Sequence, residues 1–74
     1  MPIRVIHAEY VEGYKIALTF NDGVHKIVDL SHRLSGKIFE PLKEVSFFRN
    51  FKLNFWTIEW ENGADLAPEY LYSL

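Results

Sequence analysis

The chain has 74 residues, of which ten are acidic and eight basic, and a formal net charge of −2. A chain of this length forms one domain, so residues 1–74 are expected to fold as a single unit. It contains no cysteine, which excludes disulfides and thiolate chemistry and favours a reducing, cytoplasmic location. The sequence has neither a basic stripe that would bind phosphates nor a run of about 18 apolar residues that would span a membrane. We therefore expect no direct nucleic-acid binding and no membrane segment.

The first part of the sequence predicts successive antiparallel strands. A first strand is expected over residues 3–10. A second is expected over residues 14–20, where large apolar residues alternate with smaller or polar ones. The turn after it could contain two residues, Asp22 and Gly23, or three, starting at Asn21. The two turns differ by one residue in register, so they expose opposite faces of the strands.

The three-residue turn gives the better pairing between the strands. It places Ile16 opposite Val28, which builds an apolar face. On the other face Lys15 meets Asp29, so opposite charges pair. The two-residue turn would instead set Asp29 against Ile16 on the apolar face. We therefore predict the three-residue turn, whose further pairs are Phe20 with Val24, Tyr14 with Leu30, and Thr19 with His25.

The same turn sequence occurs a second time. Residues 19–23, TFNDG, return at residues 59–63 as EWENG, and an Asp-Leu pair follows each copy. In the second copy the same register again builds an apolar face, which contains Ile58, Trp60, Ala64 and Leu66. It also places Glu59 directly opposite Asp65. The two hairpins together predict one small antiparallel sheet of five or six strands.

The segment between the hairpins predicts short helices. A capped helical turn is expected at residues 31–34. A second helix should start at Glu40, with Pro41 at its first position, and a further capped turn at Ser46. A terminal helical turn is expected over residues 68–72. Because helices this short are unstable alone, their apolar side chains must be buried against the sheet. The predicted fold is α+β, with short helices on one face of the sheet.

Several stretches of the sequence resemble a known family. They are residues 20–23 (FNDG), 28–30 (VDL), 38–42 (IFEPL), 47–48 (FF) and 58–72. The resemblance that they carry covers nearly the whole chain. The family is largely bacterial and is catalogued as domain of unknown function number 2442. Glu61 departs from its pattern, because relatives often have proline there, and the turn is expected to be less rigid as a result.

The resemblance implies a compact α+β domain without an established activity. In some relatives a similar domain is attached to a helix-turn-helix DNA-binding domain, for which this chain has no residues left over. Short relatives often lie beside a second small protein, in arrangements similar to toxin and antitoxin pairs. The resemblance therefore implies a regulatory or antitoxin-like member of a two-protein system.

Large aromatic residues give the strongest indication of function from the residues themselves. Six of them fall within residues 47–60. One face of a thin sheet does not easily bury so many rings, so some are expected to be exposed for a protein partner. Aromatic residues, Trp and Tyr above all, are enriched as anchors at protein interfaces. The candidate contact residues are Phe48, Trp56 and Trp60. An exposed edge of the first strand would also allow a homodimer.

Carboxylates at the second turn support an alternative function. Glu59, Glu61 and Asp65 gather there and could hold a hard cation in a small-ligand or metal-binding enzyme. The simpler interpretation is structural, because Asp65 can end its strand by accepting backbone donors. The chain has three histidines, His7, His25 and His32. They are too dispersed in the sequence to predict a set of metal ligands. We expect no cofactor, and a non-enzymatic protein-interaction domain is the favoured function.

Overall fold

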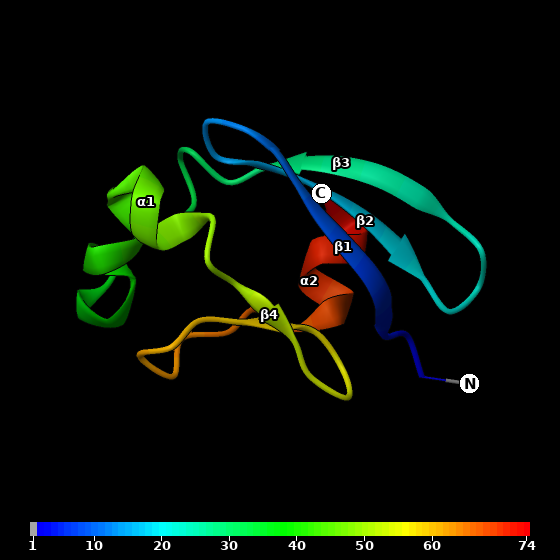
Figure 1. The fold of residues 1–74 in the computed structure, drawn as a ribbon. Helices are drawn as coiled ribbons and strands as arrows, with labels where there is room; N and C mark the ends of the chain where they lie inside the picture. The colour runs from blue at the N-terminus through cyan, green and yellow to red at the C-terminus, as the bar shows by residue number, and fades with distance from the viewer. Residues whose placement is uncertain (1) are drawn as a thin grey trace.

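The computed structural model describes residues 2–74, which form two antiparallel sheets and three short helices (Figure 1). The first sheet has the strand order β1-β2-β3, with β1 at Val5–Glu12, β2 at Lys15–Phe20 and β3 at His25–Asp29. The second pairs β4 (Lys52–Leu53) with β5 (Ile58–Glu59). The helices are the 3-10 helix η1 (Lys37–Lys43), α1 (Val45–Phe48) and α2 (Pro68–Ser73).

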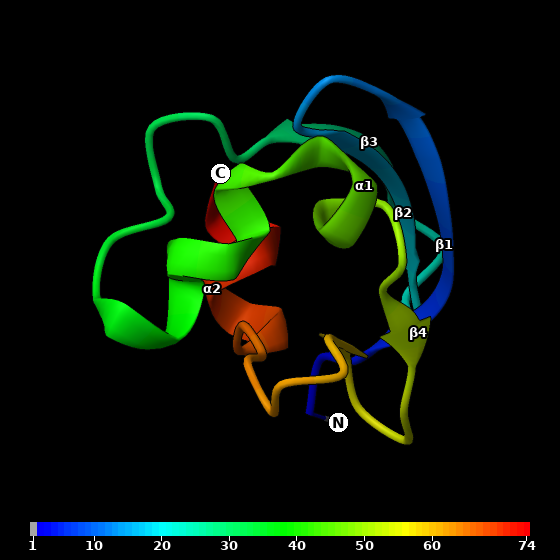
Figure 2. The same ribbon diagram turned by 60° about the vertical axis from the view of Figure 1, so that its left-hand side comes forward.

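The hydrophobic core lies between the three-stranded sheet and the segments that follow it. Figure 2 shows the sheet curving around α1 and α2. Alternate residues of β2 supply its centre, because Ile16, Leu18 and Phe20 point inward and are fully buried. This alternation is the predicted one, and burial of these large side chains is the main force holding the helices to the sheet. The other core members are Val5, Val28, Leu30, Leu34, Leu42, Phe48, Ile58, Trp60, Ala64 and Leu71.

The first turn has the predicted three-residue form. Ile16 pairs with Val28 and Lys15 with Asp29, as expected. The turn closes when Gly23, with φ of +92°, takes a conformation that other residues adopt only with strain. The side chain of Asp22 accepts a hydrogen bond of 3.0 Å from the Val24 N–H. The register prediction is therefore confirmed, and with it the separation of the apolar and polar faces.

The second turn repeats this geometry, but its strands end almost at once. Trp60 N–H donates to the Ala64 carbonyl oxygen at 2.8 Å, and Glu59 forms a single bridge with Asp65. Beyond this bridge the Thr57 hydroxyl, rather than a backbone group, binds the Leu66 carbonyl oxygen at 2.7 Å. The register is confirmed. The single sheet of five or six strands is not, because five strands divide between two sheets.

Two of the expected helices differ from the prediction. Residues 31–34 form a turn rather than a helix, in which Arg33 N–H donates to the Leu30 carbonyl oxygen at 3.1 Å. The helix α1 begins before Ser46, with Glu44 at its N-cap and no side-chain cap. Ser46 lies inside this helix, so burial of Phe48 rather than a cap holds it in place.

The other two helical segments are found near the predicted places. Pro41 lies inside η1, which starts earlier than expected, and the expected terminal turn is α2, with Pro68 near its start. Within residues 2–74, no helix has the length and apolar character needed to cross a membrane.

Contacts with the first hairpin fasten α2 to the sheet. The Tyr72 hydroxyl donates a hydrogen bond of 2.6 Å to the Asp22 carboxylate, and its ring packs edge-on against Phe20. From β3, the Lys26 ammonium binds the Tyr72 carbonyl oxygen. The end of the chain is thereby joined to the turn between β2 and β3.

Candidate partner-binding site

The structure separates the three candidate contact residues into two groups. Phe48 and Trp60 are fully buried, and their ring centroids lie 5.8 Å apart. Both belong to the core, so the expectation that they contact a partner is corrected. Trp56 is 48% exposed, and its neighbour Phe55 is 69% exposed. Phe55 was not predicted as a contact residue, because the aromatic composition of the segment does not show which rings face solvent.

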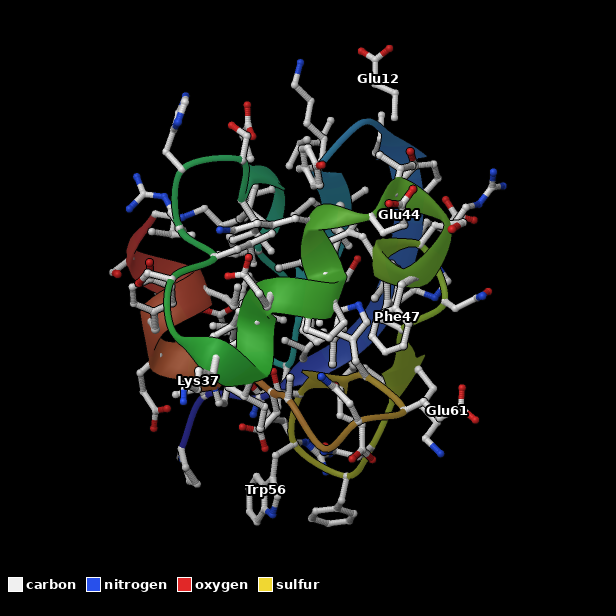
Figure 3. All side chains as sticks on the ribbon, turned by 90° about the vertical axis from the view of Figure 1, so that its left-hand side faces the viewer. Glu12, Lys37, Glu44, Phe47, Trp56 and Glu61 are labelled. Atoms are coloured by element: carbon white, nitrogen blue, oxygen red, sulfur yellow. The ribbon has the colours of Figure 1, made fainter. Side chains whose placement is uncertain are left out.

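We call Phe55 and Trp56 the aromatic tip, because they lie in the short loop between β4 and β5. Figure 3 shows Trp56 projecting from the surface of the protein. The Asn54 side-chain oxygen accepts hydrogen bonds of 2.7 Å from the N–H groups of both Trp56 and Thr57. Asparagine commonly closes turns in this way. The Val5 N–H also donates to the Trp56 carbonyl oxygen at 2.8 Å, which fastens the loop to β1.

The two rings of the aromatic tip support each other. They pack edge to face, with centroids 4.9 Å apart and planes at 83°. The Arg4 guanidinium lies 5.2 Å from the Phe55 ring centroid, a cation–π distance. The backbone N–H of Arg4 donates a hydrogen bond of 3.1 Å to the side-chain oxygen of Asn21, which fixes the main chain at this residue. These contacts restrict the freedom of the exposed rings, and such restriction lowers the entropic cost of binding a partner.

An open groove of about 410 Å³ lies beside the aromatic tip, and Trp56 forms part of its lining. Its charged lining residues, Asp65 and Glu69, are both acidic. The rest of the lining is apolar or uncharged and consists of Pro2, Ile3, Asn54, Trp56, Thr57, Ala67 and Pro68. An apolar surface with an acidic border suits a protein segment that carries apolar and basic side chains.

The predicted carboxylate cluster is only partly assembled. Glu59 and Asp65 face each other across the isolated bridge, as expected. Glu61 lies exposed at the turn and points to a different side of the protein from Trp56 (Figure 3). Among residues 2–74, no group of three His, Cys, Asp or Glu side chains could hold a metal ion. This part of the chain therefore gives the metal-site hypothesis no support.

Comparison with known proteins bears out the family resemblance. A sequence model described as "Protein of unknown function (DUF2442)" matches residues 5–74. The chain belongs to the DUF2442 family. The matched residues extend from the start of β1 to the end of α2, so they include both sheets and the aromatic tip of this DUF2442 domain. No curated protein and no solved structure was found to match the chain.

Proposed function

We propose that this DUF2442 domain is a non-enzymatic protein-interaction module that binds a small protein through the aromatic tip. One observation carries the proposal: two adjacent aromatic side chains are exposed, yet hydrogen bonds fix the turn that holds them. Exposure of aromatic surface to water is unfavourable, so its burial by a partner contributes favourable free energy to binding. A pre-ordered tryptophan is a common energetic centre of a protein interface.

The groove beside the tip defines the chemistry of the partner. Asp65 and Glu69 give it a negative border, so we expect the partner to offer lysine or arginine beside an apolar anchor. We also propose that this partner and the domain form a two-protein system in the bacterial cytoplasm, with the domain as its regulatory or antitoxin-like member. That narrower proposal rests on the resemblance to short family members that often lie beside a second small protein. The alternative, a small-ligand or metal-binding enzyme, gains no support from the described residues.

The test has two stages and uses matched variants. The tagged protein is first used to capture a stoichiometric partner from nuclease-treated lysate of its source, and mass spectrometry identifies it. Calorimetry with the purified partner then compares Trp56→Ala with Ile38→Ala, whose parent side chains are almost equally exposed. We expect Trp56→Ala to weaken binding about 30-fold, equivalent to about 2 kcal/mol, and Ile38→Ala to leave it unchanged. Equal affinities for two folded variants would refute the proposed site.

A further inference from the structure

β3 is an edge strand of the three-stranded sheet, and no other strand within residues 2–74 pairs with its outer side. The Phe20 N–H donates to the Val24 carbonyl oxygen, and the Leu30 N–H donates to that of Tyr14. Because backbone N–H and C=O groups alternate in direction along an antiparallel strand, those of the even-numbered residues of this segment point toward β2. The N–H and C=O groups of the odd-numbered residues of β3 therefore point outward, away from β2. Such an edge can accept another strand.

The opposite edge of the sheet is better protected. The register of β1 against β2 is irregular at two places, between Val5 and His7 and between Tyr10 and Glu12. Irregularities of this kind hinder pairing with a further strand. In addition, the Val5 N–H is already bound to the Trp56 carbonyl oxygen. The pairing of β3 with β2 has no such irregularity, so β3 is the open edge.

Side chains on β3 do not block this edge. Lysine is a common protecting residue on edge strands, but the Lys26 ammonium turns inward to the Tyr72 carbonyl oxygen. The central residue of the strand, Ile27, is 63% exposed. An apolar, β-branched side chain in this position favours strand pairing. β3 therefore combines free backbone groups with an exposed apolar centre.

The sequence of β3 is complementary to itself in one antiparallel register. When the strands of two copies cross at Ile27, each His25 lies opposite Asp29 of the other copy on the outer face. A histidine ring N–H can donate a hydrogen bond to a carboxylate in the directly opposed position. Sliding one strand by two residues places Ile27 opposite His25 or Asp29, so the register centred on Ile27 is the best matched.

Both members of this pair can make the additional contact. One ring nitrogen of His25, Nδ1, lies 2.9 Å from the Thr19 hydroxyl, which leaves the other ring nitrogen, Nε2, free for a hydrogen bond to Asp29 of the other copy. The Asp29 carboxylate accepts the Ser31 N–H at 2.9 Å and has further acceptor capacity. Neither residue has to give up its contacts within the chain.

We propose that two copies of this chain associate through antiparallel pairing of their β3 strands, centred on Ile27, to form a continuous six-stranded sheet. A five-residue edge buries far less than the roughly 1,200 Å² of a stable interface, so the dimer is weak and forms at high protein concentration. Its interface does not involve the aromatic tip. β3 lies along the top of the molecule in Figure 1, and the loop after β4 lies at the bottom.

Sedimentation equilibrium tests the association itself. We expect the wild-type protein to shift from monomer to dimer as its concentration approaches roughly 1 mM. Ile27→Lys should raise the dissociation constant at least about tenfold, because it places two lysines opposite each other. Val11→Lys, which changes an exposed β-branched residue on β1, should leave it unchanged. A wild-type protein that stays monomeric at the highest concentration, or equal effects of the two folded variants, would overturn the proposal.

Introduced cysteines test the register, because the chain has none of its own. Opposed Cα atoms in a hydrogen-bonded pair lie about 5.5 Å apart, within disulfide range. Ile27→Cys should therefore form a disulfide-linked dimer under mild oxidation. Residues 25 of the two copies would lie roughly 13 Å apart, so His25→Cys alone should not form one. A mixture of His25→Cys and Asp29→Cys proteins should.

This second test also applies when Ile27→Lys fails to fold. Val11→Cys provides the control for random collision at an exposed strand position. If Ile27→Cys oxidises to dimer no faster than Val11→Cys, the proposed pairing is wrong. If His25→Cys alone links as fast as Ile27→Cys, the register is wrong.

Discussion

The indole Nε1–H of Trp60 donates a hydrogen bond of 2.7 Å to the backbone carbonyl oxygen of Phe48, and both side chains are fully buried. Phe48 is the last residue of α1, where carbonyl oxygens lack partners within the helix. The bond therefore satisfies a buried acceptor and joins the second hairpin to the helical segment. The rings of Phe51 and Trp60 also pack in an edge-to-face arrangement, with centroids 6.3 Å apart.

Trp60→Phe should destabilise the protein strongly. The change leaves the buried Phe48 carbonyl oxygen without a donor and creates a void, which together lower the free energy of unfolding by about 2–4 kcal/mol. Urea denaturation followed by circular dichroism measures this loss. Trp56→Phe is the matched control and should change stability by less than about 0.5 kcal/mol, because Trp56 is half exposed. Similar losses in the two variants would contradict the different roles of the two tryptophans.

Asn54→Ala should loosen the aromatic tip without unfolding the domain. It removes the oxygen that accepts the N–H groups of Trp56 and Thr57, so both amides should exchange faster with deuterium. Affinity for the proposed partner should fall as well, by about tenfold, because the loop must be ordered on binding. Asn54→Asp retains an acceptor oxygen at this position and should keep both amides protected. Unchanged exchange in Asn54→Ala would show that other contacts hold the loop.

The contact between Asp22 and Tyr72 should make stability depend on pH at both extremes. The hydrogen bond from the Tyr72 hydroxyl, together with that from the Val24 N–H, lowers the pKa of the Asp22 carboxyl. The same Asp22 contact raises the pKa of the Tyr72 hydroxyl. The stabilisation from Asp22 is present above about pH 4 and is lost as the pH falls through its lowered pKa. That from Tyr72 is present below about pH 10 and is lost as the pH rises through its raised pKa.

Tyr72→Phe is the variant that measures this contact. Its loss of stability relative to wild type should be largest between roughly pH 5 and 9 and should shrink toward both extremes. The pKa of Asp22, followed by carboxyl NMR, should rise toward its ordinary value. Tyr70→Phe alters an exposed tyrosine of the same helix and should keep the wild-type profile. A stability difference for Tyr72→Phe that is independent of pH would contradict this account.

The parts of the fold that were predictable depend on local register. Only the three-residue turn keeps Asp29 away from the apolar face, so pairing through the first turn followed from the sequence. The second turn repeats the same residues, and its Trp60 to Ala64 bond was equally predictable. The division into two sheets was not, because it depends on β5 pairing with β4, a strand of two residues with no clear alternation.

The candidate site was only partly predictable for a related reason. The sequence shows an excess of large rings, and this correctly indicates that some of them are exposed. It does not separate Phe48 from Phe55, because burial depends on how α1 and the β4–β5 loop pack against the sheet. The signal available in the sequence was Asn54, a turn-forming residue directly before the two rings, which marks them as a loop.

The placement of β3 and the aromatic tip on different sides of the molecule has a consequence for recognition (Figure 1). A pair of domains joined along β3 keeps both tips accessible and offers them to the surroundings as a divalent ligand. Where several partner molecules stand close together, engagement of one tip raises the effective concentration of the other. Avidity of this kind can exceed the affinity of a single tip by about a hundredfold or more, without any new contact. A weak pairing of domains would thereby respond to how densely its targets are clustered.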